Sequence, residues 1–160
     1  MSAKDLAALD VPGPTITSIS TPFWQAAADG RLQIQYCEDC GRALFYPRGH
    51  CPACGGRRLI WRDASGLGRL KSYSTVHKPS HSGWLPVAPY TVGLIGLDEG
   101  PTILTFVLEG DGLPPPVGAR MQLAPAWIGA RRMPCFRESA VGRVLASRDA
   151  TDFTAGRVKS

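Results

Sequence analysis

The stretch YCEDCGRALFYPRGHCPACGG, residues 36–56, contains four of the five cysteines of this 160-residue chain. The four form two Cys-x-x-Cys pairs, with ten residues between Cys40 and Cys51. Two such knuckles, brought together by a hairpin, can surround one ion with four thiolates. Soft sulfur ligands in a tetrahedral set favour zinc, and iron is the less favoured ion. The predicted ligands are Cys37, Cys40, Cys51 and Cys54.

The cysteine pattern leaves three other interpretations open. A mononuclear iron centre would make the chain an electron carrier like rubredoxin. Two disulfides, or a chance spacing without metal, would also give this sequence, although a reducing cytosol favours metal ligands over disulfides. Because all four positions around the ion would be protein ligands, no site is left for substrate, and we predict a structural ion.

The composition fits one domain, or one domain with a small appendage. Hydrophobic residues make up 44% of the chain, and its 18 glycines and 14 prolines favour short strands and turns over long helices. The sequence has no apolar run of membrane-spanning length and no apolar segment of a secretory signal at its start, so we expect a cytoplasmic protein. A net charge of +5 permits phosphate-bearing partners without requiring them.

Before the cysteines, the sequence predicts a flexible arm over residues 1–20 and a docking helix with a lead-in strand over residues 21–35. Thr21 can cap the helix, and Gly30 suits its left-handed end. Phe23 and Trp24 would expose a large apolar surface to water if the helix stood alone. They are therefore expected to pack on this chain or on another one. If they pack on another chain, Phe23 and Trp24 are the predicted partner-docking residues.

After the zinc ribbon, predicted over residues 36–62, the hydrophobic pattern is mostly that of strands. Five strands within about 70 residues predict a small closed barrel of the OB-fold type over residues 66–138, and the fold class is mainly β. An SH3-like barrel and an incomplete sandwich have similar strand counts and stay open. Residues 139–160 have few large apolar side chains and are predicted to be a loose tail. The five expected barrel strands are RLKSYSTVH, PYTVGLIGL, PTILTFVLEG, ARMQLAPAW and MPCFRE, and LIWRD is the expected strand that leaves the ribbon.

No common catalytic motif is present in the sequence, so we predict no catalytic residues. Cys135 has no histidine partner in the pattern and is expected to be a small buried apolar residue. The long loop over residues 77–90 carries Trp84, which either covers one end of the barrel or contacts a ligand. The segment from Arg42 to Lys78 contains eight basic residues and a single acid, Asp63. These basic residues form either a solvated basic surface or an anion-binding site.

The order of these parts resembles a known family. The segment PFWQAAADGRLQIQYC, the four-cysteine ribbon, the hairpin over residues 90–108 and the final Pro134-Cys135-Phe136 are similar to the acyl-CoA-associated OB-fold proteins with a rubredoxin-like zinc ribbon, domain-of-unknown-function family thirty-five. The resemblance covers residues 21–138. The arm before it and the tail after it depart from the pattern.

The resemblance implies a non-catalytic accessory subunit. Members of that family act beside thiolase-like or ketosynthase-like acyltransferases, aldolases or hydratases, which hold the catalytic residues. It also implies a possible contact with coenzyme A, whose phosphates suit arginine. Arg42, Arg48 and Trp84 are the predicted ligand-binding residues.

A nucleic-acid-binding protein is the alternative, because OB-folds and zinc ribbons bind single strands with a basic groove and stacked aromatic rings. The aromatic residues among the basic run are Phe45, Tyr46, Trp61 and Tyr73. The alternative gives the Phe-Trp helix no role, so nucleic acid is the less favoured partner.

Overall fold

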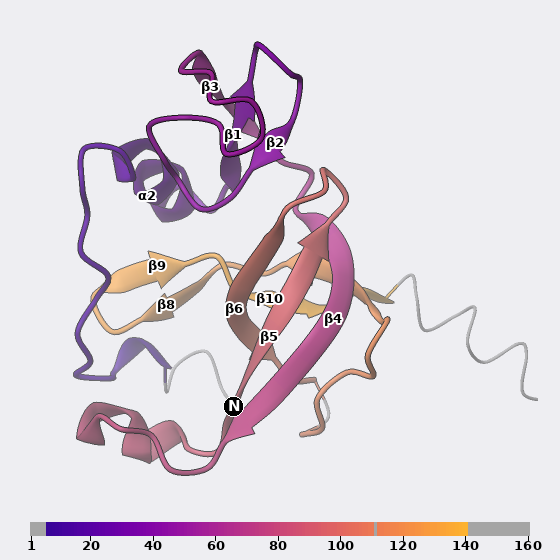
Figure 1. Ribbon diagram of the computed structural model, residues 1–160. Coiled ribbons are helices and arrows are strands. Elements are labelled where there is room, and N and C mark those ends of the chain that lie inside the picture. The colour runs from indigo at the N-terminus through magenta and orange to yellow at the C-terminus, as the bar shows by residue number, and fades with distance from the viewer. Residues whose placement is uncertain (1–5, 111, 141–160) are drawn as a thin grey trace, which may run out of the picture.

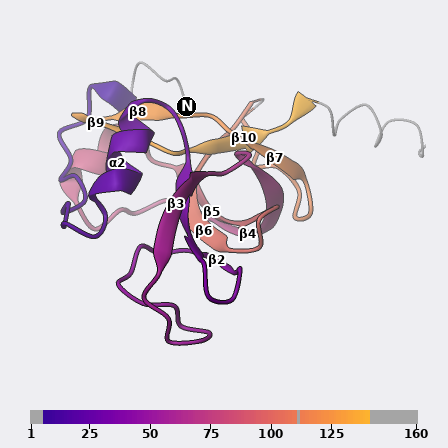
Figure 2. The ribbon, with the colours of Figure 1, turned by 90° about the horizontal axis from the view of Figure 1, so that it is seen from above.

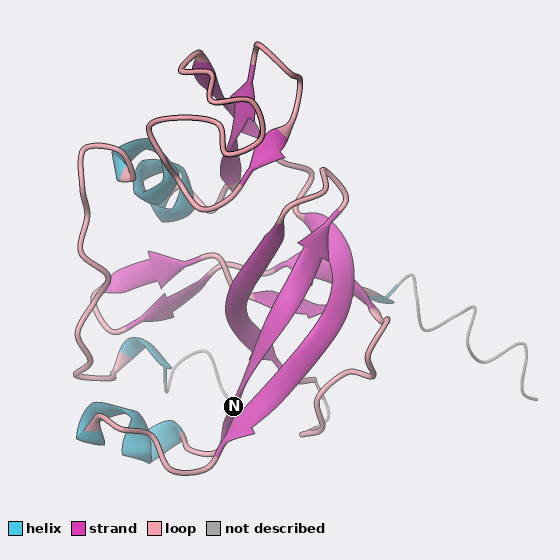
Figure 3. Cartoon of the chain, viewed as in Figure 1, coloured by secondary structure: helices cyan, strands magenta, loops and turns pink. Residues whose placement is uncertain are grey.

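In the computed structural model, residues 6–110 and 112–140 are described. Strands and connecting loops make up most of these residues, as Figure 3 shows, and the fold is mainly β, as predicted. A small sheet lies at the top of the view in Figure 1, with a barrel below it and a separate hairpin at the side.

The ribbon sheet has the strand order β2-β1-β3 and is antiparallel throughout. Strand β3 begins and ends at the residues predicted from LIWRD. Gln35 is buried in β1, and its side-chain amide bonds both backbone groups of Arg48, at 2.8 Å and 3.0 Å. The hairpin between the cysteine pairs is thereby held against the sheet. The bounds are β1 Gln33–Cys37, β2 Ala43–Leu44 and β3 Leu59–Asp63.

Five strands close into a barrel in the order β10-β6-β5-β4-β7, which confirms the OB-fold prediction. The short strand β10 closes it, because it pairs parallel with β6 and antiparallel with β7. Alternate residues of each strand point inward, where Phe136 and Ile95 are fully buried. The strands are β4 Leu67–Val76, β5 Tyr90–Leu97, β6 Thr102–Leu108, β7 Arg120–Leu123 and β10 Phe136–Glu138.

Two of the predicted strands are wrong as single strands. ARMQLAPAW divides at Pro125 into β7 and β8, and the segment ending in MPCFRE divides at Pro134 into β9 and β10. Proline has no N–H to continue a ladder, so each strand stops there. Strands β8 Ala126–Ile128 and β9 Arg131–Met133 pair with each other as a hairpin outside the barrel.

Helix α2, Thr21–Ala28, begins where the sequence predicted, but Thr21 does not cap it. The hydroxyl of Thr21 instead donates to the carbonyl of Thr17, at 2.9 Å. Gly30 adopts the predicted left-handed conformation, with φ of 80°. Seen from above in Figure 2, α2 lies beside the β8–β9 hairpin, and Arg132 donates a hydrogen bond to the carbonyl of Ala28.

Within the arm predicted over residues 1–20, a strap over residues 6–11 packs on the fold, whereas most of residues 12–19 are exposed. Leu6 and Leu9 are buried in a second apolar cluster outside the barrel, together with residues of the β8–β9 hairpin and of the short 3-10 helix η1, Ser82–Val87. The strap is also bonded to the hairpin, since the Gly129 N–H donates to the Leu6 carbonyl at 2.9 Å. Residues 1–5 lie outside the described part of the chain.

Strand β10 ends at Glu138, where the predicted barrel ends, and one further residue is held against the barrel. Ser139 is buried, and its N–H donates to the carbonyl of Arg120 at 2.8 Å. This bond continues the pairing of β10 with β7 past the end of the strand, so the first residue of the segment predicted as a tail is attached to the barrel. The tail from residue 141 onward lies outside the described residues.

An ion pair on the barrel predicts a weak dependence of stability on pH. Arg120 donates two hydrogen bonds to Asp98, at 2.7 Å and 2.5 Å, and these hold the pKa of the Asp98 carboxyl below its usual value of 3.8. The ionised carboxyl therefore stabilises the fold above about pH 4, and this contribution is lost as the pH falls. Both side chains are partly exposed, so the effect is small. Asp98→Asn should lower Tm slightly at pH 7, and the difference from the wild type should shrink as the pH falls below about 4, measured by circular dichroism; a difference that stays constant would contradict the assignment.

Candidate functional site

The four predicted ligand cysteines come together at the tip of the ribbon. Their Sγ atoms all lie within 4.8 Å of one another, with Cys37 and Cys54 at 3.6 Å and Cys40 and Cys51 at 3.7 Å. Zinc–sulfur bonds of about 2.3 Å in a tetrahedron place the sulfurs about 3.8 Å apart. All four cysteines are free thiols in the structure. The donor set therefore fits a single four-thiolate ion.

The two knuckles have the same backbone geometry. In each, the glycine after the second cysteine has a positive φ, 72° at Gly41 and 76° at Gly55. Each of these glycines donates its N–H to the carbonyl of the first cysteine of its knuckle, at 2.8 Å. Only glycine adopts this conformation without strain, which explains why it follows each pair. The repeated turn gives the two knuckles the same shape, and the four Sγ atoms lie within 4.8 Å of one another.

The surroundings of the thiols shift their pKa values unequally. At Cys51 burial raises the pKa, but backbone N–H groups of Ala53 and Cys54 and the neighbouring thiols outweigh burial, and the pKa falls to about 7. At Cys54 the N–H of Gly56 lowers the pKa, but the neighbouring thiols and burial together raise it to about 12. Neighbouring thiolates repel one another, so the four thiols do not all ionise easily without a cation. A divalent cation bound between them would offset this repulsion.

The two knuckles are also joined by charged side chains. Arg58, just after the second knuckle, donates from Nε to Asp39 in the first knuckle, at 2.8 Å, and its terminal amino group contacts the same carboxylate. Asp39 raises the pKa of the Arg58 guanidinium through these hydrogen bonds. This pair helps to hold the knuckles in register.

The structure places the predicted ligand-binding residues at three separate positions. Arg42 is exposed, and its carbonyl accepts the N–H of Cys37, so it belongs to the first knuckle. Arg48 lies before the second knuckle, and its Nε donates to the carbonyl of Tyr46 at 3.1 Å. Trp84 stacks on Phe106, with ring centroids 5.1 Å apart, against the outer face of the barrel. Ligand binding by these residues stays a prediction.

The two predicted docking residues have different environments. Phe23 is only 5% exposed and belongs to the core that joins the ribbon to the barrel, so it is not available to a partner. Trp24 is half-buried and packs edge-on against Phe23, with ring centroids 4.8 Å apart. Of the two, Trp24 alone keeps a surface that a partner can reach.

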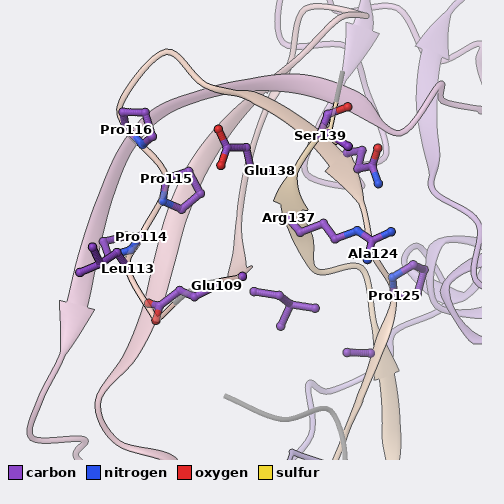
Figure 4. Close-up of a pocket in the computed structure, with 15 residues that line it drawn as sticks. Glu109, Leu113, Pro114, Pro115, Pro116, Ala124, Pro125, Arg137, Glu138 and Ser139 are labelled. Atoms are coloured by element: carbon purple, nitrogen blue, oxygen red, sulfur yellow. The ribbon is translucent and has the colours of Figure 1, made fainter. Parts of the chain in front are cut away.

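Two concavities were not anticipated from the sequence. The larger, of about 870 Å³, lies beside β10 and the loop before β7. Figure 4 shows Pro114–Pro116 along one side of it and Arg137 and Pro125 along the other, with Glu138 between them. Glu109, on its lower side, accepts a hydrogen bond from Thr91 at 2.5 Å. The smaller concavity, between α2 and β6, is treated below.

Cys135 is fully buried, as predicted, and burial raises the pKa of its thiol to about 12. The thiolate is therefore not accessible near neutral pH, which excludes Cys135 as a nucleophile in this state.

Among the described residues, no helix is long and apolar enough to cross a membrane.

Comparison with known proteins identifies both parts of the chain. The family model of the ChsH2 rubredoxin-like zinc ribbon domain matches residues 24–59, and that of the ChsH2 C-terminal OB-fold domain matches residues 61–124. Together the two models match more than half of the chain.

Among curated proteins, a probable enoyl-CoA hydratase alpha subunit of Thermomonospora curvata is 36% identical over 95 residues, which are 59% of this chain and 29% of that protein. A DUF35 domain-containing scaffold protein of Methanothermobacter thermautotrophicus is 33% identical over 76 residues, and one of Pyrococcus furiosus is 38% identical over 73. These matches cover 47% and 46% of this chain. The matched part spans 56% and 52% of the two scaffold proteins.

Among solved structures, a chain of the Ltp2-ChsH2(DUF35) aldolase superposes with a TM-score of 0.70 at 28% identity, covering 79% of this chain and 98% of that one. A DUF35 protein of Sulfolobus solfataricus superposes with a TM-score of 0.55 at 15% identity, covering 76% and 86%, and shows the same fold. With both domain models matched in order and the predicted ribbon and barrel present, the chain belongs to the DUF35 family, with a ChsH2-type zinc ribbon and OB-fold.

Proposed function

We propose that the chain is a non-catalytic accessory subunit of an enzyme complex that acts on acyl-CoA or related acyl substrates. The catalytic partner in this proposal is a thiolase-like or ketosynthase-like acyltransferase or an aldolase, with a hydratase as the further candidate. One observation carries the proposal: the superposition on the Ltp2-ChsH2(DUF35) aldolase covers almost all of that chain. The names of the hydratase subunit and the two scaffold proteins support the same role.

The proposed cofactor is one zinc ion bound by the four cysteines. The sulfur spacing and the zinc-ribbon family model support this assignment. Bound there, zinc would fix the ribbon in shape without taking part in chemistry, because no coordination position is left open. The proposal also places the protein in the cytoplasm. It keeps Arg42 and Arg48 as candidate contacts for coenzyme A phosphates.

The proposed partner is tested by affinity purification of the tagged full chain from nuclease-treated native extract, with bound proteins identified by mass spectrometry. A thiolase-like or ketosynthase-like enzyme, an aldolase or a hydratase subunit should be recovered in near-stoichiometric amount. Recovery of nucleic acid from untreated extract, with no such enzyme, would overturn the proposal in favour of a nucleic-acid-binding protein.

Trp24→Ala should reduce the recovered partner at least tenfold, while the isolated variant keeps its fold. The reason is that a half-buried tryptophan can contribute several kcal/mol at an interface centre. Trp127→Ala, at an exposed tryptophan of the β8–β9 hairpin, is the matched control and should bind the partner normally. Equal partner recovery by both variants would exclude Trp24 as the docking residue.

A further inference from the structure

An apolar groove of about 320 Å³ lies between α2, the segment that follows β2, and β6. One wall is aromatic and the other is mainly aliphatic, and neither carries an ionisable acid or base other than the Tyr46 phenol. The segment between β9 and β10 closes one side. The groove is lined chiefly by Phe23, Trp24, Phe45, Tyr46, Leu104 and Phe106.

The aromatic wall is a continuous row of rings. The centroids of Phe23 and Phe45 are 5.4 Å apart, and those of Phe45 and Tyr46 are 4.4 Å apart. Phe23 is anchored in the core, so the row has a fixed base. A wall of packed rings is preformed, and an apolar ligand would not have to order it first.

Two of the polar side chains in the groove already have partners within the chain. The hydroxyl of the buried Thr105 donates to the carbonyl of Pro134, at 2.7 Å. The hydroxyl of Ser20 bonds Thr17. A polar ligand would gain little from these groups, whereas an apolar one removes the ring and leucine surfaces from water.

The groove is open to solvent along an apolar rim. Leu104 is 53% exposed and Tyr46 is 52% exposed. Leu94 lies directly opposite Leu104 in the β5–β6 pairing and is also exposed. Apolar residues gathered in this way mark a binding surface, unlike single exposed leucines.

A positively charged side chain lies next to the groove. Arg48 follows the groove residues Tyr46 and Pro47, and its Nε is bonded to the Tyr46 carbonyl. No ion pair joins Arg48 to a carboxylate in the described part of the chain. Its terminal amino groups can therefore serve an anionic group at the edge of the groove.

The size of the groove limits what can enter it. An engineered cavity of about 150 Å³ binds benzene, with six carbons, so a groove twice that size holds on the order of ten to twelve carbons. A complete coenzyme A molecule is too large for this volume. An acyl chain of medium length fits, with its head group outside.

We propose that the groove binds the linear hydrocarbon chain of a medium-chain acyl compound, whose anionic head group lies outside it at Arg48. The choice of acyl compounds rests on the proposed function. Binding by this chain alone does not, because the residues that form the groove and Arg48 all belong to it. A partner docked at Trp24 would then face the bound chain.

The test is a calorimetric titration of the full-length, metal-loaded chain with hexanoate, octanoate, decanoate, decanol and decanoyl-CoA, all below their micellar concentrations. Each added methylene from hexanoate to decanoate should tighten binding two- to fourfold, as expected for buried hydrocarbon. Decanoate should bind better than decanol, and Arg48→Met should remove that preference. Binding of decanoyl-CoA with Kd at or below that of decanoate would identify the thioester as the physiological form; weaker binding would identify the free carboxylate.

Leu104→Arg should weaken decanoate binding at least tenfold, because the exposed side chain can be replaced without opening the core. Leu113→Arg is the matched control at a leucine that is 77% exposed and lines the other concavity. The proposal is overturned if no chain-length dependence is found or if the two arginine variants bind decanoate equally. Since no partner is present in the titration, these outcomes are independent of the pull-down.

Discussion

Cys51→Ser should remove the metal and unfold the ribbon. Cys51 is 1% exposed, and its Sγ atom lies 3.7 Å from the Sγ atom of Cys40. Its sulfur is therefore a buried member of the four-cysteine set. A serine hydroxyl is a hard ligand that stays protonated, and zinc does not bind it in place of a thiolate. Structural zinc supplies about 10 kcal/mol or more to folding, so the loss should exceed the stability of the ribbon itself. Metal content should fall from about one ion per chain to nearly none.

The measurement combines elemental analysis by mass spectrometry with thermal unfolding followed by circular dichroism. Cys135→Ala is the matched control, since Cys135 is equally buried but lies outside the metal set. That variant should keep its ion and lose only a little stability. If Cys51→Ser retained both its metal and its Tm, the four cysteines could not form the site. If the wild-type protein were red and contained iron, the ion would be iron instead of zinc, and the four ligands would be the same.

The metal site could be predicted from sequence because its information is local. Two Cys-x-x-Cys turns, each followed by a glycine, fix the ligands before any long-range contact forms. The strand β3 was predictable for the same reason, because the short run LIWRD lies between the second cysteine pair and a turn-rich segment. The five barrel strands also follow from periodicity, which predicts strands but not their partners.

The features that were missed depend on contacts between distant segments. Leu6 and Leu9 lie three residues apart but belong to no sustained helix or strand pattern that would predict burial, and they are buried where η1 and the β8–β9 hairpin meet over them. The hairpin itself was hidden by two prolines that divide apparently continuous strands at Pro125 and Pro134. Likewise, the groove is lined by four segments spread over more than 100 residues of sequence. No local pattern marks it.

Phe23→Ala should destabilise the whole domain by about 3–5 kcal/mol, which is the usual cost of removing a buried aromatic ring. The ring is 5% exposed and packs on Trp24 and Phe45, and it belongs to the same core cluster as Ile34 of the ribbon and Phe136 of the barrel. Its loss leaves a cavity where the two parts meet. Chemical denaturation should show a lower midpoint with an unchanged m-value.

A comparison of Phe23 with the neighbouring Trp24 distinguishes a role in the core from a role in partner docking. Trp24 is only half-buried, so Trp24→Ala should cost clearly less stability than Phe23→Ala, although it removes the larger ring. Phe23→Leu, which keeps most of the volume, should recover much of the loss. If Phe23→Ala unfolded at the wild-type midpoint yet failed to retain the partner enzyme, Phe23 would be a docking residue after all, and its burial in the isolated chain would have to be relieved when the partner binds.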